Sequence, residues 1–134
     1  MTFPLTIVGL GEAVFDVFPD KEVLGGTSLN VAVQAHQLLD PLGGRGVLLS
    51  RIGADDLGQR LQAEFQSRAL PLEYVQVDDA KPTGQVLVSF VDGAPRYEIV
   101  MDTAWDHLAY TDHEVGLAHA CNAVSFGSMS QRHP

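Results

Sequence analysis

A short segment in the first third of the chain combines residue types that favour contact between the backbone and a polar ligand. It reads GGTSLN, and an apolar helical pattern follows it. Gly25 and Gly26 permit positive φ angles and let another group approach the backbone closely. Thr27 or Ser28 can cap the helix, and Asn30 offers both a donor and an acceptor in the first helical turn. Because capping alone does not explain both glycines and the asparagine, the segment is a candidate ligand contact.

A second candidate is the carboxylate of Asp16, which follows an apolar run at residues 5–11. Proteins built on parallel sheets bind their ligands at the carboxyl ends of the strands, and Asp16 stands just past such an end. Its oxygens can accept hydrogen bonds from neighbouring hydroxyls of a sugar or a polyol. The alternative is a solvated loop aspartate, and the residue type alone leaves both interpretations open.

Other motifs that carry chemistry are incomplete. Gly9 and Gly11 lie at the end of the first apolar run, but Val14 replaces the third glycine of the dinucleotide-binding fingerprint. Asp55 and Asp56 precede a helix, where adjacent acids usually act as cap and dipole partners rather than as metal ligands. The five histidines are scattered without zinc-ligand spacing, and no hydrolase nucleophile motif occurs. We therefore expect no metal site in this chain.

These candidates are positioned by alternating strands and helices in the first half of the chain. Short apolar runs at 5–11 and 46–53 predict buried strands, and apolar residues at helical spacing predict helices at 28–39 and 54–70. This order is typical of an α/β protein with a parallel sheet. Residues 12–24 are expected to be a strand or an extended segment that passes into a loop at Pro19–Asp20.

The middle of the chain has a different pattern. Residues 72–77, 83–91 and 95–101 alternate apolar and polar side chains, and Asp92–Gly93 is a turn signal between the last two runs. Such alternation is typical of antiparallel strands with one solvated face. We expect these strands to form an antiparallel addition to the α/β body.

The end of the chain predicts one more helix and one more strand. The run TDHE at 111–114 is a capping box, which predicts a short helix to about Ala120. Residues 122–127 then predict a third buried strand. A parallel sheet that stops just after a strand lacks a helix over its next face, so we expect the chain to be a piece of a larger domain.

Composition limits the class of protein. With 134 residues and a hydrophobic fraction of 46%, the chain suffices for one folded domain. Acidic residues outnumber basic ones by 17 to 8 without a basic stripe, which argues against binding nucleic acid. No apolar run reaches the roughly 18 residues that span a bilayer, so we expect no membrane partner. The single cysteine, Cys121, is expected in the core, and a lone cysteine favours the cytoplasm.

Five segments follow one another in an order that is more specific than any one of them. They are GEAVFDVF (11–18), GGTSLNVA (25–32), SRIGADDLGQRL (50–61), the pair PTGQVLVSFVDG (82–93) and PRYEIVMDTAWDHL (95–108), and FGSMSQR (126–132). Together they resemble the N-terminal half of the ribokinase-like, or PfkB, carbohydrate kinases, in the branch that contains the fructokinases. The resemblance runs through almost the whole chain.

The resemblance implies a fold for the whole chain, residues 1–134. The chain would be the N-terminal part of a sugar kinase domain, with a truncated, doubly wound parallel α/β sheet. A small antiparallel β-sheet lid would be formed by strands at about 12–24 and 72–101.

The resemblance also implies roles for individual residues. The substrate-binding residues would be Asp16, Gly25, Gly26 and Asn30, with the glycine backbone against the sugar hydroxyls. Further contacts with the substrate or the lid would come from Phe18, Trp105 and Gly127. From the residue type alone, Trp105 is expected either in the core beneath the lid or against the ligand.

The chain departs from the family in its catalytic motifs. Family members are longer, and their second half contains a Gly-Ala-Gly-Asp motif that stabilises the transferred phosphoryl group and supplies the catalytic base. Neither this motif nor a P-loop occurs in the 134 residues. The resemblance therefore implies a sugar kinase that uses ATP and Mg²⁺ for the parent protein. For this chain it implies sugar binding with no catalytic residue, no strong binding of ATP or Mg²⁺, and no activity alone.

Two other functions fit the same sequence. A non-catalytic module would bind a sugar or a nucleoside and would form a homodimer through exposed lid strands, whose free edges can pair with a second copy. A nucleoside kinase of the same fold is the other alternative, because only the AWD (104–106) and FGS (126–128) segments favour a fructokinase over it, and they do so weakly.

Overall fold

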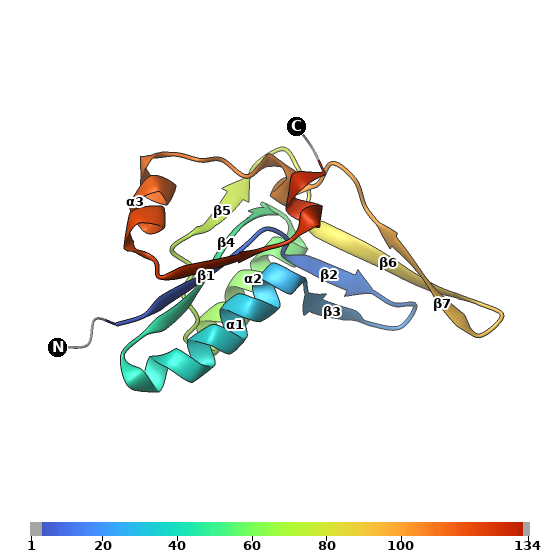
Figure 1. The fold of residues 1–134 in the computed structure, drawn as a ribbon. Coiled ribbons are helices and arrows are strands. Elements are labelled where there is room, and N and C mark those ends of the chain that lie inside the picture. Colours follow the sequence, from blue (N-terminus) through green and yellow to red (C-terminus); the bar gives the residue numbers. More distant parts are fainter. Residues whose placement is uncertain (1–3, 133–134) are drawn as a thin grey trace.

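The computed structural model describes residues 4–132, which form two four-stranded sheets (Figure 1). The main sheet has the order β5-β4-β1-β8, and all its strands are parallel. Its strands are β1 (Thr6–Leu10), β4 (Arg45–Gly53), β5 (Val75–Asp78) and β8 (Ala123–Phe126). The predicted α/β body with a parallel sheet is thereby confirmed.

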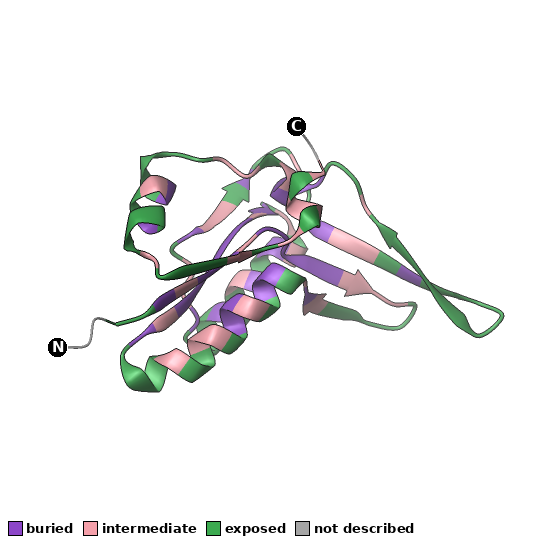
Figure 2. Ribbon diagram, viewed as in Figure 1, coloured by how far each residue is buried: buried purple, intermediate pink, exposed green. Residues whose placement is uncertain are grey.

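Helices cover both faces of the main sheet. Helices α1 (Thr27–Leu39) and α2 (Asp56–Ser67) enclose one core with β4, and α3 (Asp112–Ala120) packs into a second core through Leu117. Figure 2 shows buried residues in β1, in β4 and along α1. Three short 3-10 helices complete the described elements: η1 (Asp40–Leu42), η2 (Ala104–His107) and η3 (Ser128–Gln131). No helix within residues 4–132 is long and apolar enough to cross a membrane.

The second sheet, which we call the lid sheet, consists of two hairpins that extend away from the main sheet (Figure 1). One hairpin joins β2 (Val14–Val17) to β3 (Glu22–Gly25), and the other joins β6 (Gly84–Val91) to β7 (Ala94–Ile99). Each hairpin is antiparallel, but β2 and β6 pair in parallel, so the expected wholly antiparallel lid is wrong at this junction. The reason is that β2 follows β1 and β6 follows β5, and both leave the carboxyl edge of the main sheet in the same direction.

One strand predicted for the lid belongs to the main sheet. Residues 72–77 alternate like a lid strand, but β5 pairs in parallel with β4, with Ser50 opposite Val75. β5 is an edge strand of the main sheet, and an edge strand is partly solvated. Alternation alone therefore does not separate it from a strand of the lid sheet.

The predicted capping box at the start of α3 is confirmed, with Thr111 as the N-cap and Glu114 bonded back to it. The side-chain amide of Gln76 in β5 donates to the same carboxylate at 3.0 Å and to the carbonyl of Ala109 at 2.8 Å. Hydrogen bonding from Thr111 dominates over burial and holds the pKa of Glu114 at about 2. These bonds fix α3 against the β5 edge of the main sheet.

The predicted strand near the end of the chain exists as β8, but its predicted burial is wrong. Val124 and Phe126 are 42% and 61% exposed, because β8 pairs with β1 on one side and with no other strand of residues 4–132. Cys121, just before β8, is half-buried and packs against the core beneath α3.

Two glycines let α1 lie directly against the main sheet. A Cβ atom on Gly9 of β1 would lie 2.0 Å from the carbonyl oxygen of Ser28, and one on Gly46 of β4 would lie 2.1 Å from that of Ala32. Both distances are far below van der Waals contact, so any side chain at these positions would push the helix away. The glycines thus place the start of α1 beside the end of β1.

We predict that Gly9→Ala lowers the free energy of unfolding by about 1–3 kcal/mol, because the added methyl group overpacks the contact between α1 and β1. Gly116→Ala is the matched control, since a Cβ on Gly116 in α3 meets no atom within 4 Å. The control should gain about 0.5–1 kcal/mol from alanine's higher helix propensity. Urea denaturation measures both, and equal effects of the two substitutions would contradict the close packing.

Candidate functional site

Asp16 lies in the middle of β2, between Val23 of β3 and Val86 of β6. Its neighbour Phe15 packs into the core with α1 and α2, so Asp16 projects from the opposite face of the lid sheet. The carboxylate is half-buried, and within residues 4–132 it accepts no hydrogen bond. A partly buried carboxylate without a protein partner is available to a ligand.

Gly25, at the end of β3, is directly beside this carboxylate. A Cβ atom on Gly25 would lie 3.2 Å from Oδ2 of Asp16, which is tighter than ordinary contact. The absence of a side chain at residue 25 therefore leaves the carboxylate accessible from this side. The structure thus brings together two of the predicted site residues.

Gly26 forms the N-cap of α1 with a φ of 107°, a left-handed conformation that favours glycine. The prediction that Thr27 or Ser28 caps the helix is wrong, because the N-cap residue is Gly26, which has no side chain to accept a hydrogen bond. Glu12, from the connector between β1 and β2, fulfils this role instead. Its Oε1 accepts from the amide of Thr27 at 3.0 Å, and its Oε2 lies 3.3 Å from the hydroxyl of Ser28.

Sequence reasoning missed Glu12, although a signal existed. Glu12 stands between Gly11 and Ala13, within a run of buried residues, and is itself 9% exposed. A buried carboxylate needs hydrogen-bond donors, and the free amides at the start of a helix are a common source of them. A Cβ on Gly26 would lie 2.7 Å from the carbonyl oxygen of Glu12, so the glycine turn and the Glu12 connector are packed tightly together.

Asn30 lies in the first turn of α1, where its backbone amide donates to the carbonyl of Gly26 at 2.9 Å. Its side chain is exposed and makes no hydrogen bond to any residue between 4 and 132. The asparagine is therefore free to donate to and accept from a ligand near the glycine turn.

A cleft of ≈ 430 Å³ opens at the carboxyl ends of β1 and β8. It is lined by Leu10, Gly11, Trp105, Asp106, Leu108, Phe126, Ser130 and Gln131. Open α/β sheets bind ligands at this edge. The lining of the cleft includes none of the predicted substrate-binding residues, so the cleft and the Asp16 face of the lid sheet are two separate parts of the candidate site.

Trp105 lies in the core, one of its two predicted positions, and it also forms a wall of this cleft. It is only 4% exposed, and a Cβ on Gly84 at the root of β6 would lie 2.6 Å from its indole. The guanidinium of Arg132 lies 4.2 Å from the centre of the indole ring and also forms an ion pair with Asp106. The indole therefore connects the lid sheet to the end of the described chain.

The other two predicted contacts lie at different distances from the cleft. Gly127 directly follows Phe126 at the end of β8, and its carbonyl accepts from the hydroxyl of Ser130 at 2.7 Å. Phe18 lies beyond the far end of β2, with the amine of Lys21 5.3 Å from its ring centre. β2 begins at Val14, which lies opposite Gly84 and therefore close to Trp105 in the wall of the cleft. Phe18 is four residues further along, about 13 Å from that point, so the structure does not place it at the cleft.

The predicted cap role of Asp55 is confirmed, because its Oδ1 accepts from the amide of Gly58 at 2.8 Å at the start of α2. Burial raises the pKa of Asp55, but hydrogen bonds from Thr83 and Gly58 together lower it below its usual value. No group of three or more acidic, histidine or cysteine residues among the described residues is arranged to hold a metal ion.

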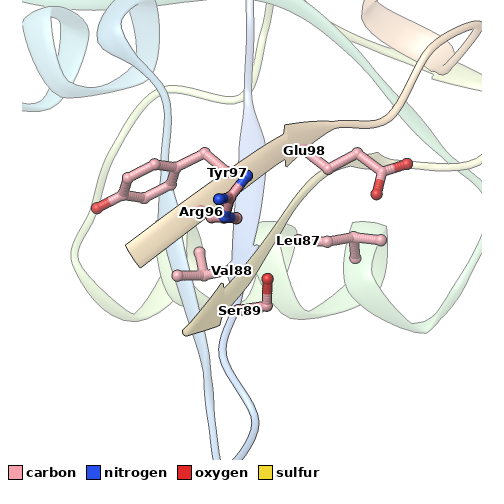
Figure 3. Close-up of a pocket in the computed structure, with 6 residues that line it drawn as sticks. All are labelled: Leu87, Val88, Ser89, Arg96, Tyr97 and Glu98. Atoms are coloured by element: carbon pink, nitrogen blue, oxygen red, sulfur yellow. The ribbon is translucent and has the colours of Figure 1, made fainter. Parts of the chain in front are cut away.

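A second hollow, of ≈ 600 Å³, lies on the hairpin of β6 and β7 (Figure 3). Figure 3 shows Val88 and Tyr97 projecting to one side of the hairpin and Leu87 and Glu98 to the other. Ser89 and Arg96 complete its lining. This hollow spans both faces of an exposed hairpin and is not part of the cleft.

Comparison with known proteins points to one family. Residues 8–131 match the pfkB family of carbohydrate kinases. A fructokinase of Klebsiella pneumoniae is 32% identical to the chain over 84 residues, which are 59% of this chain and 26% of that enzyme. The chain spans 26–33% of the lengths of the three curated relatives that it matches.

Solved structures of sugar kinases share the fold. A fructokinase of Halothermothrix orenii has a TM-score of 0.78 at 22% identity, and the match covers 97% of this chain and 48% of that one. A fructokinase of Xylella fastidiosa with bound ATP has a TM-score of 0.74 at 23% identity, with 92% and 39% covered. The family and the fold expected from the five sequence segments are therefore confirmed.

We predict that Glu12→Ala lowers the free energy of unfolding by about 1–2 kcal/mol, because it leaves the partly buried amide of Thr27 without its side-chain acceptor at the start of α1. Glu64→Ala is the control, since Glu64 is exposed and pairs only with Arg68 one helical turn away. Such a pair contributes about 0.3–0.5 kcal/mol. If the two substitutions had the same effect in urea denaturation, Glu12 would not hold the start of α1.

Proposed function

Because the chain belongs to the pfkB family of carbohydrate kinases, we propose that it forms the sugar-binding and lid part of a fructokinase-like enzyme. The parent enzyme would transfer the γ-phosphoryl group of ATP to a sugar hydroxyl, releasing ADP and the sugar phosphate. The Klebsiella and Halothermothrix relatives, both fructokinases, and the ATP bound to the Xylella enzyme support this reaction. We place it in the cytoplasm, where the thiol of Cys121 stays reduced.

The observation that carries the proposal is the free carboxylate of Asp16. It is half-buried, it has no hydrogen-bond partner within residues 4–132, and Gly25 leaves one side of it open. A carboxylate can accept a hydrogen bond at each of its two oxygens, which matches a pair of adjacent hydroxyl groups. Asn30, at the nearby start of α1, would complete the polar contacts.

The electrostatics of the site favour a neutral ligand over an anion. The carboxylate of Glu12 already occupies the start of α1, where free amides would otherwise attract a phosphate. Arg132, which stacks on a wall of the cleft, is paired with Asp106. An unphosphorylated sugar therefore suits these residues better than a sugar phosphate.

We propose that the residues between 4 and 132 contribute little to a magnesium–ATP site. The described residues hold no cluster of metal ligands, and the cleft is lined largely by apolar groups and by Asp106. When bound to the parent enzyme, magnesium–ATP supplies the phosphoryl group. The contribution we propose for this chain is to bind the sugar and, through Trp105 and the lid sheet, to exclude water from it.

We predict that Asp16→Asn weakens the binding of D-fructose about tenfold or more, because the amide cannot accept as many hydrogen bonds from sugar hydroxyls. Asp20→Asn is the control, since Asp20 is exposed in the loop between β2 and β3. Calorimetric titration compares D-fructose, D-ribose and adenosine, which separates a sugar kinase from a nucleoside kinase. In the parent enzyme ATP binding should not change, and equal losses for sugar and ATP would contradict this role of Asp16.

We also propose a homodimer through the free edge of the lid sheet, the feature on which a non-catalytic module would depend. The amide of Val100 donates to Gln85 across the hairpin, so Tyr97 and Ile99 direct their backbone groups to the free edge of β7. Pro95, which lacks an amide hydrogen, stands in the same outward set. Tyr97 is 66% exposed and Ile99 is 39% exposed.

The charges of β7 are complementary to those of a second copy. If two β7 strands pair antiparallel about Tyr97, each Arg96 lies directly opposite Glu98 of the second copy. The two charges share one face of the sheet, because they are two residues apart in a strand.

We predict that Arg96→Glu dissociates the dimer by placing like charges opposite each other, and that adding Glu98→Arg restores it. Sedimentation equilibrium measures the association, and Arg68→Glu at the C-cap of α2 controls for the change in net charge. A wild-type chain that stays monomeric at high concentration, or a dimer that survives Arg96→Glu, would exclude this interface.

A further inference from the structure

Gly53, Asp55 and Gly58 form a Gly-x-Asp-x-x-Gly motif within the segment SRIGADDLGQRL (50–61). The motif has no part in the proposed sugar site, yet its residues surround the root of the lid sheet. Thr83, directly before β6, is completely buried. Its amide donates to Oδ2 of Asp55 at 2.8 Å, and its hydroxyl donates to Oδ1 at 2.6 Å. The hydroxyl oxygen accepts from the amide of Gly53 at 3.0 Å. We call this group of hydrogen bonds the Asp55–Thr83 latch.

The two glycines of the motif are needed for this close approach. A Cβ on Gly53 would lie 2.6 Å from the amide nitrogen of Thr83. A Cβ on Gly58 would lie 2.0 Å from the carbonyl oxygen of Gly53 and 3.1 Å from the hydroxyl of Thr83. The end of β4, the start of α2 and the root of β6 therefore meet without room for a side chain.

The latch holds the first connection of the β6–β7 hairpin, and the second connection is bonded to the first. The segment before β6 carries Thr83 itself. The segment after β7 returns to the body at Ala104, whose amide donates to the carbonyl of Pro82 at 2.8 Å. An ion pair of 2.6 Å between Lys81 and Asp102 also joins the two segments. A movement of the hairpin relative to the main sheet must therefore strain the bonds to Asp55.

The same bonds bear on Asp16. β6 pairs with β2 so that Gly84 lies opposite Val14 and Val86 lies opposite Asp16. Thr83 is therefore three residues before Val86, the residue that pairs with Asp16 across the lid sheet. Hydrogen bonds to a carboxylate are stronger than those between neutral groups, so the latch is suited to fix this register.

We propose that Asp55 is a positioning residue, which holds the lid sheet through Thr83 in the orientation that lets Asp16 bind the sugar. This inference rests on the proposed sugar site for its effect on affinity. The arrangement of the lid sheet that it describes can be tested without any ligand.

The test compares two variants that weaken the latch with two that do not. Asp55→Asn keeps a good N-cap for α2 but turns an amide group toward the amide of Thr83. Thr83→Val removes the hydroxyl at nearly constant volume. Thr83→Ser keeps the hydroxyl and should behave like the wild type. Asp56→Asn removes the same charge from the exposed neighbour of Asp55 and serves as the matched control.

Residue-resolved hydrogen exchange provides the first readout. We expect the amides of β6 and β7 to exchange about tenfold faster in Asp55→Asn and Thr83→Val, because a buried donor or acceptor is left unpaired. The amides of β1, and those of β4 other than Gly53, should be unchanged, since the amide of Gly53 is itself a donor in the latch. A uniform acceleration in β1, β4 and the lid sheet, or no acceleration in the lid sheet, would overturn the proposal. If Thr83→Val does not fold, Asp55→Asn gives the same comparison.

Titration with D-fructose provides the second readout. We expect affinity to fall about tenfold in the two latch variants and to be retained in Thr83→Ser and Asp56→Asn. A lid sheet that exchanges faster while the affinity stays unchanged would overturn the role of Asp55 in positioning Asp16. If the wild-type chain does not bind D-fructose, the proposed sugar site fails, and hydrogen exchange still decides whether the latch exists.

Discussion

The hydrogen bonds of two carboxylates, Glu12 and Asp55, join the lid sheet to the main sheet. Each carboxylate lies at the start of a helix and accepts from backbone amides there. Glu12 itself belongs to the connector that leads from β1 to β2, and Asp55 holds the connector that leads to β6 through Thr83. The two parallel strands at the centre of the lid sheet are therefore both anchored at the carboxyl edge of the main sheet, where ligands of α/β proteins bind.

This arrangement separates structural acids from an acid that is free for function. Three carboxylates are partly or fully buried, and their oxygens accept hydrogen bonds from protein donors: Glu12, Asp55 and Asp106. Asp16 differs from these three residues, because it is half-buried and accepts no hydrogen bond within residues 4–132. Glycine at residue 25 keeps it open. The candidate site therefore depends on Asp16, a carboxylate that the described fold leaves without a hydrogen-bond donor from the protein.

Local patterns in the sequence predicted the elements well, because hydrophobic spacing, the box at Thr111 and the cap at Asp55 all act within a few residues. The errors arose where the partner is distant in sequence. The start of α1 is capped by Glu12, fifteen residues away from Thr27, which no local rule indicates. Periodicity does not specify which strands become neighbours. It therefore could not predict the sheet to which β5 belongs, the parallel pairing of β2 with β6 or the exposure of β8. The proximity of Asp16 to residue 25 came from family resemblance and agrees with the hairpin register.

The most direct test of the account is a titration of the isotope-labelled chain with D-fructose, followed by amide chemical shifts. The account predicts saturable shifts at Asp16, Gly25 and Asn30 and at the cleft beside Trp105, with β7 unaffected. Saturable shifts confined to other surfaces, or no shifts at sugar concentrations in the millimolar range, would contradict the claim that the free carboxylate of Asp16 defines a sugar site.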